Sequence, residues 1–163
     1  MSFAWKLIAV LAFVFCLALA PACSGDSQQA LPTDDAIAGL NREASPCKDV
    51  PPAGAFQMQP PAPDAGKLAA FAGAWEGRAG AKVVWLVVES IDSTGYSGVY
   101  SFGGTTARGP GIVLQDGSLL LGDRGPIQFK WALESKSGGM LAARTEGGVV
   151  TDGWSMTRCR LQA

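Results

Sequence analysis

Residues 126–134 read PIQFKWALE, and this stretch decides the fold class. Apolar and polar side chains alternate along it, which is the period of a β-strand with one buried face. The apolar members are Ile127, Phe129, Trp131 and Leu133. The alternation therefore predicts one strand of an antiparallel sheet whose apolar face meets a core.

Comparable stretches lie on both sides of it, between glycine-containing turns. Of the 21 glycines, 18 follow residue 64, a rhythm that is typical of antiparallel strands joined by tight turns. We expect residues 103–110 to form a loop or a frayed edge strand, and Asp116-Gly117 to form a type I′ hairpin turn. The expected strands lie near residues 75–79, 83–91, 96–102, 111–115, 118–121, 126–134, 140–145 and 149–161.

About eight short strands in sequential order predict a mainly β fold, an antiparallel up-and-down meander that forms a closed or nearly closed small barrel. Closure is favoured because it removes exposed sheet edges. We assign this domain to residues 67–163. Asp64 is expected to cap a short helix over residues 67–72 just before the first strand.

Residues 1–22 are predicted to be a signal peptide. Lys6 precedes an apolar run over residues 7–20, which is shorter than the roughly 20 residues that a membrane span needs. Residues 18–20 and 20–22 both have the A-x-A form of a signal peptidase site. The sequence thus predicts export.

The second of these sites ends at Cys23 and resembles the lipobox of bacterial lipoproteins. This resemblance implies acylation of Cys23 and, because Ser24 rather than Asp follows, an outer-membrane lipoprotein facing the periplasm. Cleavage after Ala20 would instead leave a soluble periplasmic or secreted protein with an unmodified Cys23.

The cysteine count agrees with lipidation. Removal of the signal leaves Cys23, Cys47 and Cys159, an odd number for an oxidising compartment. The simplest solution is an acylated Cys23 and a Cys47–Cys159 disulfide. The alternative is a Cys23 that is free or paired with another molecule.

Residues 23–66 are rich in proline and poor in large apolar side chains. This composition predicts a lipid-anchored linker, with one short helix over residues 33–42 that Thr33 caps. The chain contains 13 basic and 14 acidic residues with no basic cluster, so nucleic acid is a poor partner.

Gly73-Ala74-Trp75, after a short helix and at the start of a meander, resembles the opening of the calycin barrels, which include lipocalins and fatty-acid-binding proteins. In that family the tryptophan packs at the closed end of the barrel under a basic residue of the last strand. The resemblance implies a pair of Trp75 and Arg158, with Arg160 as the second candidate, and a barrel that binds small ligands.

The sequence offers little for catalysis. It contains no histidine, which removes the His-dependent triads and the commonest zinc ligand, and we expect neither a metal nor another cofactor. Glu76, Glu89 and Glu134 could support a His-free hydrolase, but we interpret them as solvated strand charges. We therefore expect a protein that is not an enzyme.

Aromatic side chains form the only candidate ligand surface. Tyr96, Tyr100 and Phe102 share the face of one expected strand, and Phe129 and Trp131 share the face of another. Trp85 and Trp154 are candidates for the mouth of a pocket. The aromatic side chains either pack as core or line an apolar or sugar-stacking pocket. The first hypothesis is a non-catalytic binding module for a small apolar or carbohydrate ligand or an envelope protein, and the alternative is a structural domain of envelope assembly. The residues expected to line a ligand are Tyr96, Tyr100, Phe102, Phe129 and Trp131.

Overall fold

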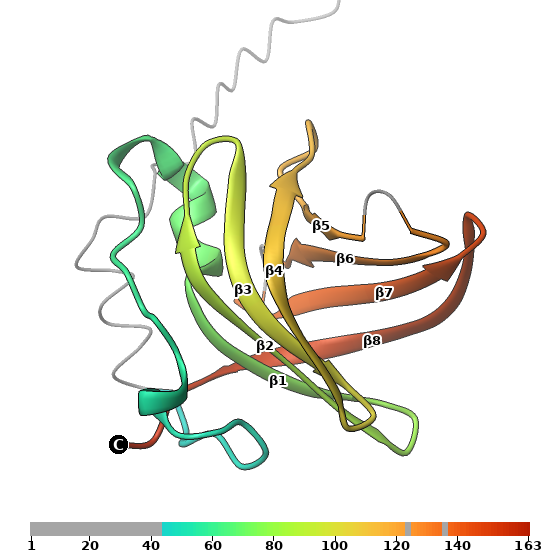
Figure 1. Ribbon diagram of the computed structural model, residues 1–163, viewed down its shortest axis with the longest axis horizontal. Coiled ribbons are helices and arrows are strands. Elements are labelled where there is room, and N and C mark those ends of the chain that lie inside the picture. Colours follow the sequence, from blue (N-terminus) through green and yellow to red (C-terminus); the bar gives the residue numbers. More distant parts are fainter. Residues whose placement is uncertain (1–43, 123–124, 135–136) are drawn as a thin grey trace, which may run out of the picture. The chain divides into compact units, whose positions relative to one another are not determined.

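The computed structural model describes residues 44–122, 125–134 and 137–163, which form a closed antiparallel barrel of eight strands (Figure 1). Each strand pairs with the next along the chain and the last pairs with the first, so the mainly β, up-and-down topology predicted from the sequence is confirmed. The strands are β1 (Gly73–Ala79), β2 (Lys82–Ile91), β3 (Gly95–Phe102), β4 (Thr105–Val113), β5 (Leu119–Leu121), β6 (Ile127–Leu133), β7 (Met140–Glu146) and β8 (Val149–Cys159). Two 3₁₀ helices precede them, η1 (Ala53–Ala55) and η2 (Pro63–Phe71).

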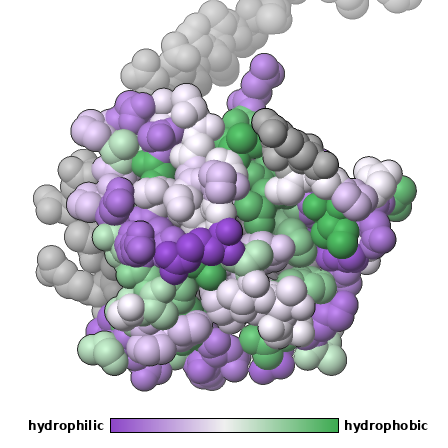
Figure 2. Space-filling view, in the orientation of Figure 1, coloured by the Kyte–Doolittle hydropathy of each residue, from purple (hydrophilic) through white to green (hydrophobic). Residues whose placement is uncertain are grey.

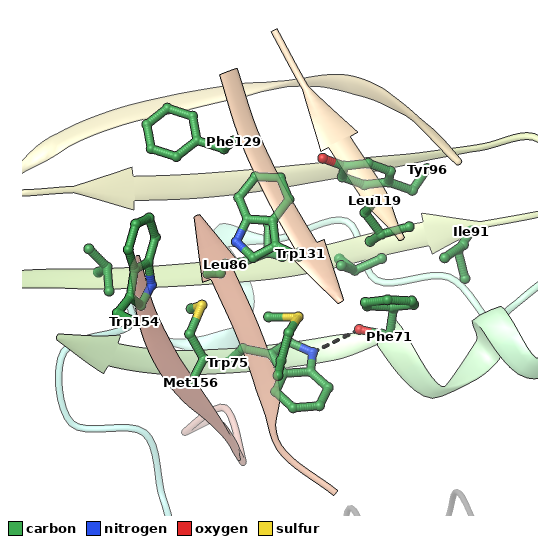
Figure 3. Packing of buried hydrophobic residues seen from close by; sticks show 14 of the residues in the cluster. Phe71, Trp75, Leu86, Ile91, Tyr96, Leu119, Phe129, Trp131, Trp154 and Met156 are labelled. Atoms are coloured by element: carbon green, nitrogen blue, oxygen red, sulfur yellow. Dashed lines mark hydrogen bonds between the residues drawn. The ribbon is translucent and has the colours of Figure 1, made fainter. Parts of the chain in front are cut away.

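The barrel interior is filled mainly by aromatic, aliphatic and methionine side chains (Figure 3). Trp131 is almost fully buried, and its ring centre lies 6.0 Å from that of Phe129 and 6.4 Å from that of Tyr96. Burial of each such side chain contributes about 1.5–3 kcal/mol. The alternation of the strands thus produces one continuous core.

One end of the barrel, which we call the closed end, is covered by η2. Phe71 is buried in the core, and its carbonyl accepts a hydrogen bond of 2.8 Å from Trp75 Nε1, drawn in Figure 3. The expected helix over residues 67–72 is instead a 3₁₀ helix that begins at Pro63 and kinks at Gly66. Asp64 does not cap it, because its carboxylate accepts a hydrogen bond from Ser93.

Residues 44–62, which we call the strap, lie against the outer surface of the barrel beside β1 and β2 (Figure 1). The predicted disulfide is confirmed, since Cys47 is bonded to Cys159 at the end of β8. Farther along the strap, Phe56 meets the ring of Trp85 edge to face, with 6.1 Å between the ring centres. The segment expected to be a linker therefore packs on the domain from residue 44 onward.

The β4–β5 connection differs from the expected type I′ turn. Leu114 N–H donates to the Ser118 carbonyl and Gly117 N–H to the Leu114 carbonyl, each at 2.9 Å, and Gly117 has a φ of 76°. This is a three-residue hairpin loop that needs a left-handed residue at its last position. The Asp116 carboxylate selects it by accepting hydrogen bonds from the Ser118 backbone and hydroxyl.

Residues 105–110, expected as a loop or a frayed edge strand, belong to β4 and pair with β3 along their whole length. On its other side β4 pairs with β5 only at Ile112 and Val113. The wall of the barrel is therefore thin between the first half of β4 and the end of β5. Figure 2 shows apolar surface at the place where β4 and β5 separate in Figure 1.

Candidate ligand-binding site

A cavity of about 340 Å³ lies at the end of the barrel opposite η2, which we call the open end. Strands β2 to β7 all contribute to it at this end. Its lining residues are Lys82, Tyr100, Phe102, Thr105, Leu121, Gly122, Ile127, Phe129 and Arg144. The volume falls at the lower limit of small-molecule sites, which measure about 300–1,000 Å³.

Small residues lie on the inner face of the first half of β4. The register places Thr105 opposite Phe102 and Ala107 opposite Tyr100, so both lie on the inward-facing side. Thr105 itself lines the cavity. The first half of β4 therefore supplies no large side chain to fill this end of the barrel.

Three aromatic rings form the apolar part of the cavity. The ring centre of Phe129 lies 4.8 Å from that of Tyr100 and 5.6 Å from that of Phe102. Behind them the core closes, and the remaining space beside Trp154 and Met156 amounts to about 10 Å³. The cavity is therefore a shallow cup at the open end and not a channel through the barrel.

Two cations stand over one of these rings. Lys82 Nζ lies 4.7 Å from the ring centre of Phe102, and the guanidinium carbon of Arg144 lies 5.9 Å from it. Arg144 also pairs with Glu146 at 2.9 Å and with Asp152 at 3.6 Å, whereas no described carboxylate lies within 4.0 Å of Lys82. The charge of Arg144 is compensated, whereas that of Lys82 has no partner among the carboxylates of the described residues.

The structure divides the five aromatic residues expected to line a ligand. Tyr100, Phe102 and Phe129 line the cavity, whereas Tyr96 and Trp131 are buried in the core farther from the open end. The other two tryptophans considered for the mouth of the pocket are placed differently. Trp85 points outward under the strap, and Trp154 lies inside, 5.5 Å from Phe102 between ring centres.

Lys82, Thr105, Leu121 and Arg144 were not predicted as site residues. Lys82 precedes the inward-facing Val84 by two residues, and Arg144 follows the inward-facing Ala142 by two. The period of the strand would have placed both charges on the interior side. The sequence does not reveal that barrel closure brings them to the same ring.

Two buried polar atoms in the core have no hydrogen-bond partner in the described part of the chain, Tyr96 Oη and Trp154 Nε1. Burial raises the pKa of the Tyr96 phenol well above its ordinary value, and Tyr100 adds a smaller effect in the same direction. In Figure 3 the indole nitrogen of Trp154 faces the interior of the barrel. Trp154 also lines the small space behind the cup.

At the closed end, the guanidinium carbon of Arg158 lies 4.4 Å from the ring centre of Trp75. Arg158 also donates hydrogen bonds to the carbonyls of Ala72, at 2.6 Å, and Ala70. Burial lowers the pKa of Arg158 to about 10. The pair that the calycin resemblance implies is thus present as a contact, and it ties η2 to β1 and β8.

The three glutamates do not converge on one site. Glu89 was expected to be a solvated strand charge, and this is wrong because the strap buries it. Its carboxylate accepts a hydrogen bond of 2.6 Å from Gln57 N–H and lies 3.2 Å from Arg108. Glu134 is exposed beside the β6–β7 turn, and Glu76 accepts a hydrogen bond from the strap backbone at Lys48.

Within residues 44–122, 125–134 and 137–163 no group of three or more acidic, cysteine or histidine side chains is arranged to hold a metal ion. The same residues include no helix with the length and apolarity of a membrane span. The predicted signal peptide, Cys23 and the helix over residues 33–42 lie outside the described residues. Comparison with family models, curated proteins and solved structures finds no match.

Proposed function

We propose that the protein is a non-catalytic binding module of the bacterial cell envelope, whose barrel holds a small ligand in the cup at its open end. The observation that carries this proposal is the cavity of about 340 Å³ at the open end, beyond which the interior of the barrel is packed. Tyr100, Phe102 and Phe129 present ring surface to that space. Aromatic rings at a concave site bind apolar or sugar-like bodies by stacking and burial.

The proposal includes no catalytic step. The described lining of the cup holds hydroxyl groups and two cations, but no carboxylate and no thiol. The chain contains no histidine to act as a general base. Binding without turnover is the function that these side chains support.

We further propose that the barrel is held at the outer membrane, facing the periplasm, by a lipid on Cys23. This rests on residues 1–22 and on the odd number of cysteines, because the confirmed bridge uses Cys47 and Cys159 and leaves Cys23 over. Mass spectrometry of the protein extracted from membranes tests it. A mature chain that starts at Cys23 with added acyl mass supports the anchor, and an unmodified start at Pro21 contradicts it.

Tryptophan fluorescence tests the binding function, because Trp154 and Trp131 lie next to the rings of the cup. The mature protein is titrated with small aromatic compounds, short-chain amphiphiles and oligosaccharides. Thr105→Phe, at a residue that lines the cup, should fill it and weaken every binder. Thr106→Phe, at the next residue of β4, which is exposed and does not line the cup, is the matched control and should bind as the unaltered chain does.

The outcome separates the two hypotheses drawn from the sequence. Binding with a dissociation constant below about 1 mM that Thr105→Phe abolishes and Thr106→Phe preserves supports the binding module. Absence of binding across the whole set contradicts it and favours the structural role in envelope assembly. Binding that both variants retain places the ligand elsewhere and also contradicts the proposal.

A further inference from the structure

We infer that the ligand of the cup is a compact apolar or aromatic acid, and that Lys82 is its counter-charge. This inference rests on the proposed binding function and deepens it, because it names the chemical class of the ligand. Two independent features of the open end carry it. They are the depth of the cup and the charge at its rim.

The small depth of the cup favours a ligand with a compact apolar part. The cavity of about 340 Å³ ends at Phe129, and the separate space that Trp154 and Met156 line behind it is only about 10 Å³. A long alkyl chain has no path toward the closed end, because Trp131 and Leu86 are also buried there. The aromatic rings instead offer flat surfaces near the mouth.

The charge at the rim selects an anion. Lys82 lies in the cavity lining and over the Phe102 ring, and it has no carboxylate partner among the described residues. Arg144 forms ion pairs with Glu146 and Asp152, which neutralise the charge of its guanidinium group. An acid seated on the rings would thus meet one uncompensated ammonium group, and a charge-assisted hydrogen bond is about twice as strong as a neutral one.

The test compares three head groups on one ring system. Naphthoate, naphthalenemethanol and naphthalenemethylamine are titrated by calorimetry into the mature protein, its Lys82→Met and Lys82→Arg variants, and the control Lys67→Met. Lys67 lies on η2 at the closed end and is exposed. We expect naphthoate to bind about five- to tenfold more tightly than the alcohol, and the amine to bind most weakly.

The variants should separate the charge from the shape of the site. Lys82→Met should reduce naphthoate binding to that of the alcohol and leave the alcohol unchanged. Lys82→Arg and Lys67→Met should retain the preference, and added salt should diminish it. An alcohol or amine that binds as well as naphthoate overturns the assignment of an acid while the binding function stands. Failure of all three head groups, together with failure of the broader ligand set, overturns the binding function itself.

A series of fatty acids tests compactness. Each buried methylene raises affinity about fourfold, so affinity should rise from hexanoate only until the cup is full and then level off. An affinity that rises steadily through tetradecanoate would overturn the inference that the ligand is compact. The Lys82→Met variant should shift every member of the series by a similar factor.

Discussion

Removal of the Cys47–Cys159 bridge is the perturbation whose magnitude follows most directly from the structure. The two cysteines lie 112 residues apart in the sequence. In the chain-entropy model, closing a loop of this length lowers the entropy of the unfolded chain by about 16 cal/mol/K. This stabilises the folded protein by about 4.8 kcal/mol at 25 °C. The variant Cys47→Ala/Cys159→Ala should lose most of that amount from a domain stability of about 5–15 kcal/mol.

Urea denaturation followed by tryptophan fluorescence measures the loss. The midpoint should fall, and the slope m should rise, because an unfolded chain without the bridge exposes more surface. The unaltered protein, unfolded and refolded in reductant, should follow the curve of the double variant. The double variant itself should not respond to reductant.

A control separates the bridge from the packing of the strap. Phe56→Ala removes the contact with Trp85 but leaves the bridge in place, so it should lower the midpoint without changing m. A loss below about 1 kcal/mol for the double variant, with m unchanged, would refute the reasoning. It would mean that the bridge does not limit the unfolded chain and that the strap is held by its other contacts.

Three further changes test individual contacts by chemical denaturation. Tyr96→Phe should leave the stability unchanged or raise it by about 1 kcal/mol, because the buried hydroxyl of Tyr96 has no partner in the described residues. The pKa of the Tyr96 phenol is higher in the folded than in the unfolded protein. The stability of the unaltered protein should therefore fall as pH rises past about 10, and that of the variant should fall less. Glu89→Gln should lower the free energy of unfolding by about 1–3 kcal/mol, because the Glu89 side chain is only 4% exposed. A double-mutant cycle with Arg108→Met should show coupling, because the Arg108 side chain, 44% exposed, is its ion-pair partner. Gly77→Ala should cost about 1–3 kcal/mol, because its Cβ would lie 2.4 Å from a β8 carbonyl, whereas Gly109→Ala, with open space around it, should be tolerated.

The topology of the barrel is predictable from the sequence where side chains alternate strongly. Residues 96–102 and 126–134 place their rings on one face, and the structure packs those rings together. The glycine pairs at 103–104 and 147–148, interpreted as turns, adopt positive φ angles. Local pattern suffices in these segments because the period of the strand alone decides which side chains are buried.

Prediction is weaker where tertiary contacts override local preference. Residues 105–110 read TTARGP and favour a loop or a frayed edge strand, yet they form a regular strand because they pair with β3 along their whole length. The strap reads as a proline-rich linker, but a few anchors hold it to the barrel. Cys47 reaches Cys159, and Phe56 packs on Trp85. Each anchor depends on a partner distant in the sequence, and no local pattern contains that information.

The site combines both situations. Tyr100, Phe102 and Phe129 belong to alternating strands and could be assigned to the interior, whereas Lys82 and Arg144 resemble solvated charges at strand ends. Their meeting over Phe102 follows from closure of the barrel, which brings β2 and β7 to the same rim. A period-two count that included strand ends would have placed both charges inward, but not at one ring.

The distribution of large and small residues inside the barrel distinguishes the two ends. At the closed end large side chains pack against one another. Trp75 donates a hydrogen bond to the Phe71 carbonyl, and Arg158 lies over the Trp75 ring. At the open end a cavity of about 340 Å³ lies beside Thr105, and the rings of Tyr100 and Phe129 line it. Larger apolar side chains there would bury more apolar area and stabilise the barrel by about 25 cal/mol per Å². A sequence shaped by stability alone would place such side chains there, so the retained cup, with its rings and a lysine that has no carboxylate partner among the described residues, is the feature that argues for a ligand.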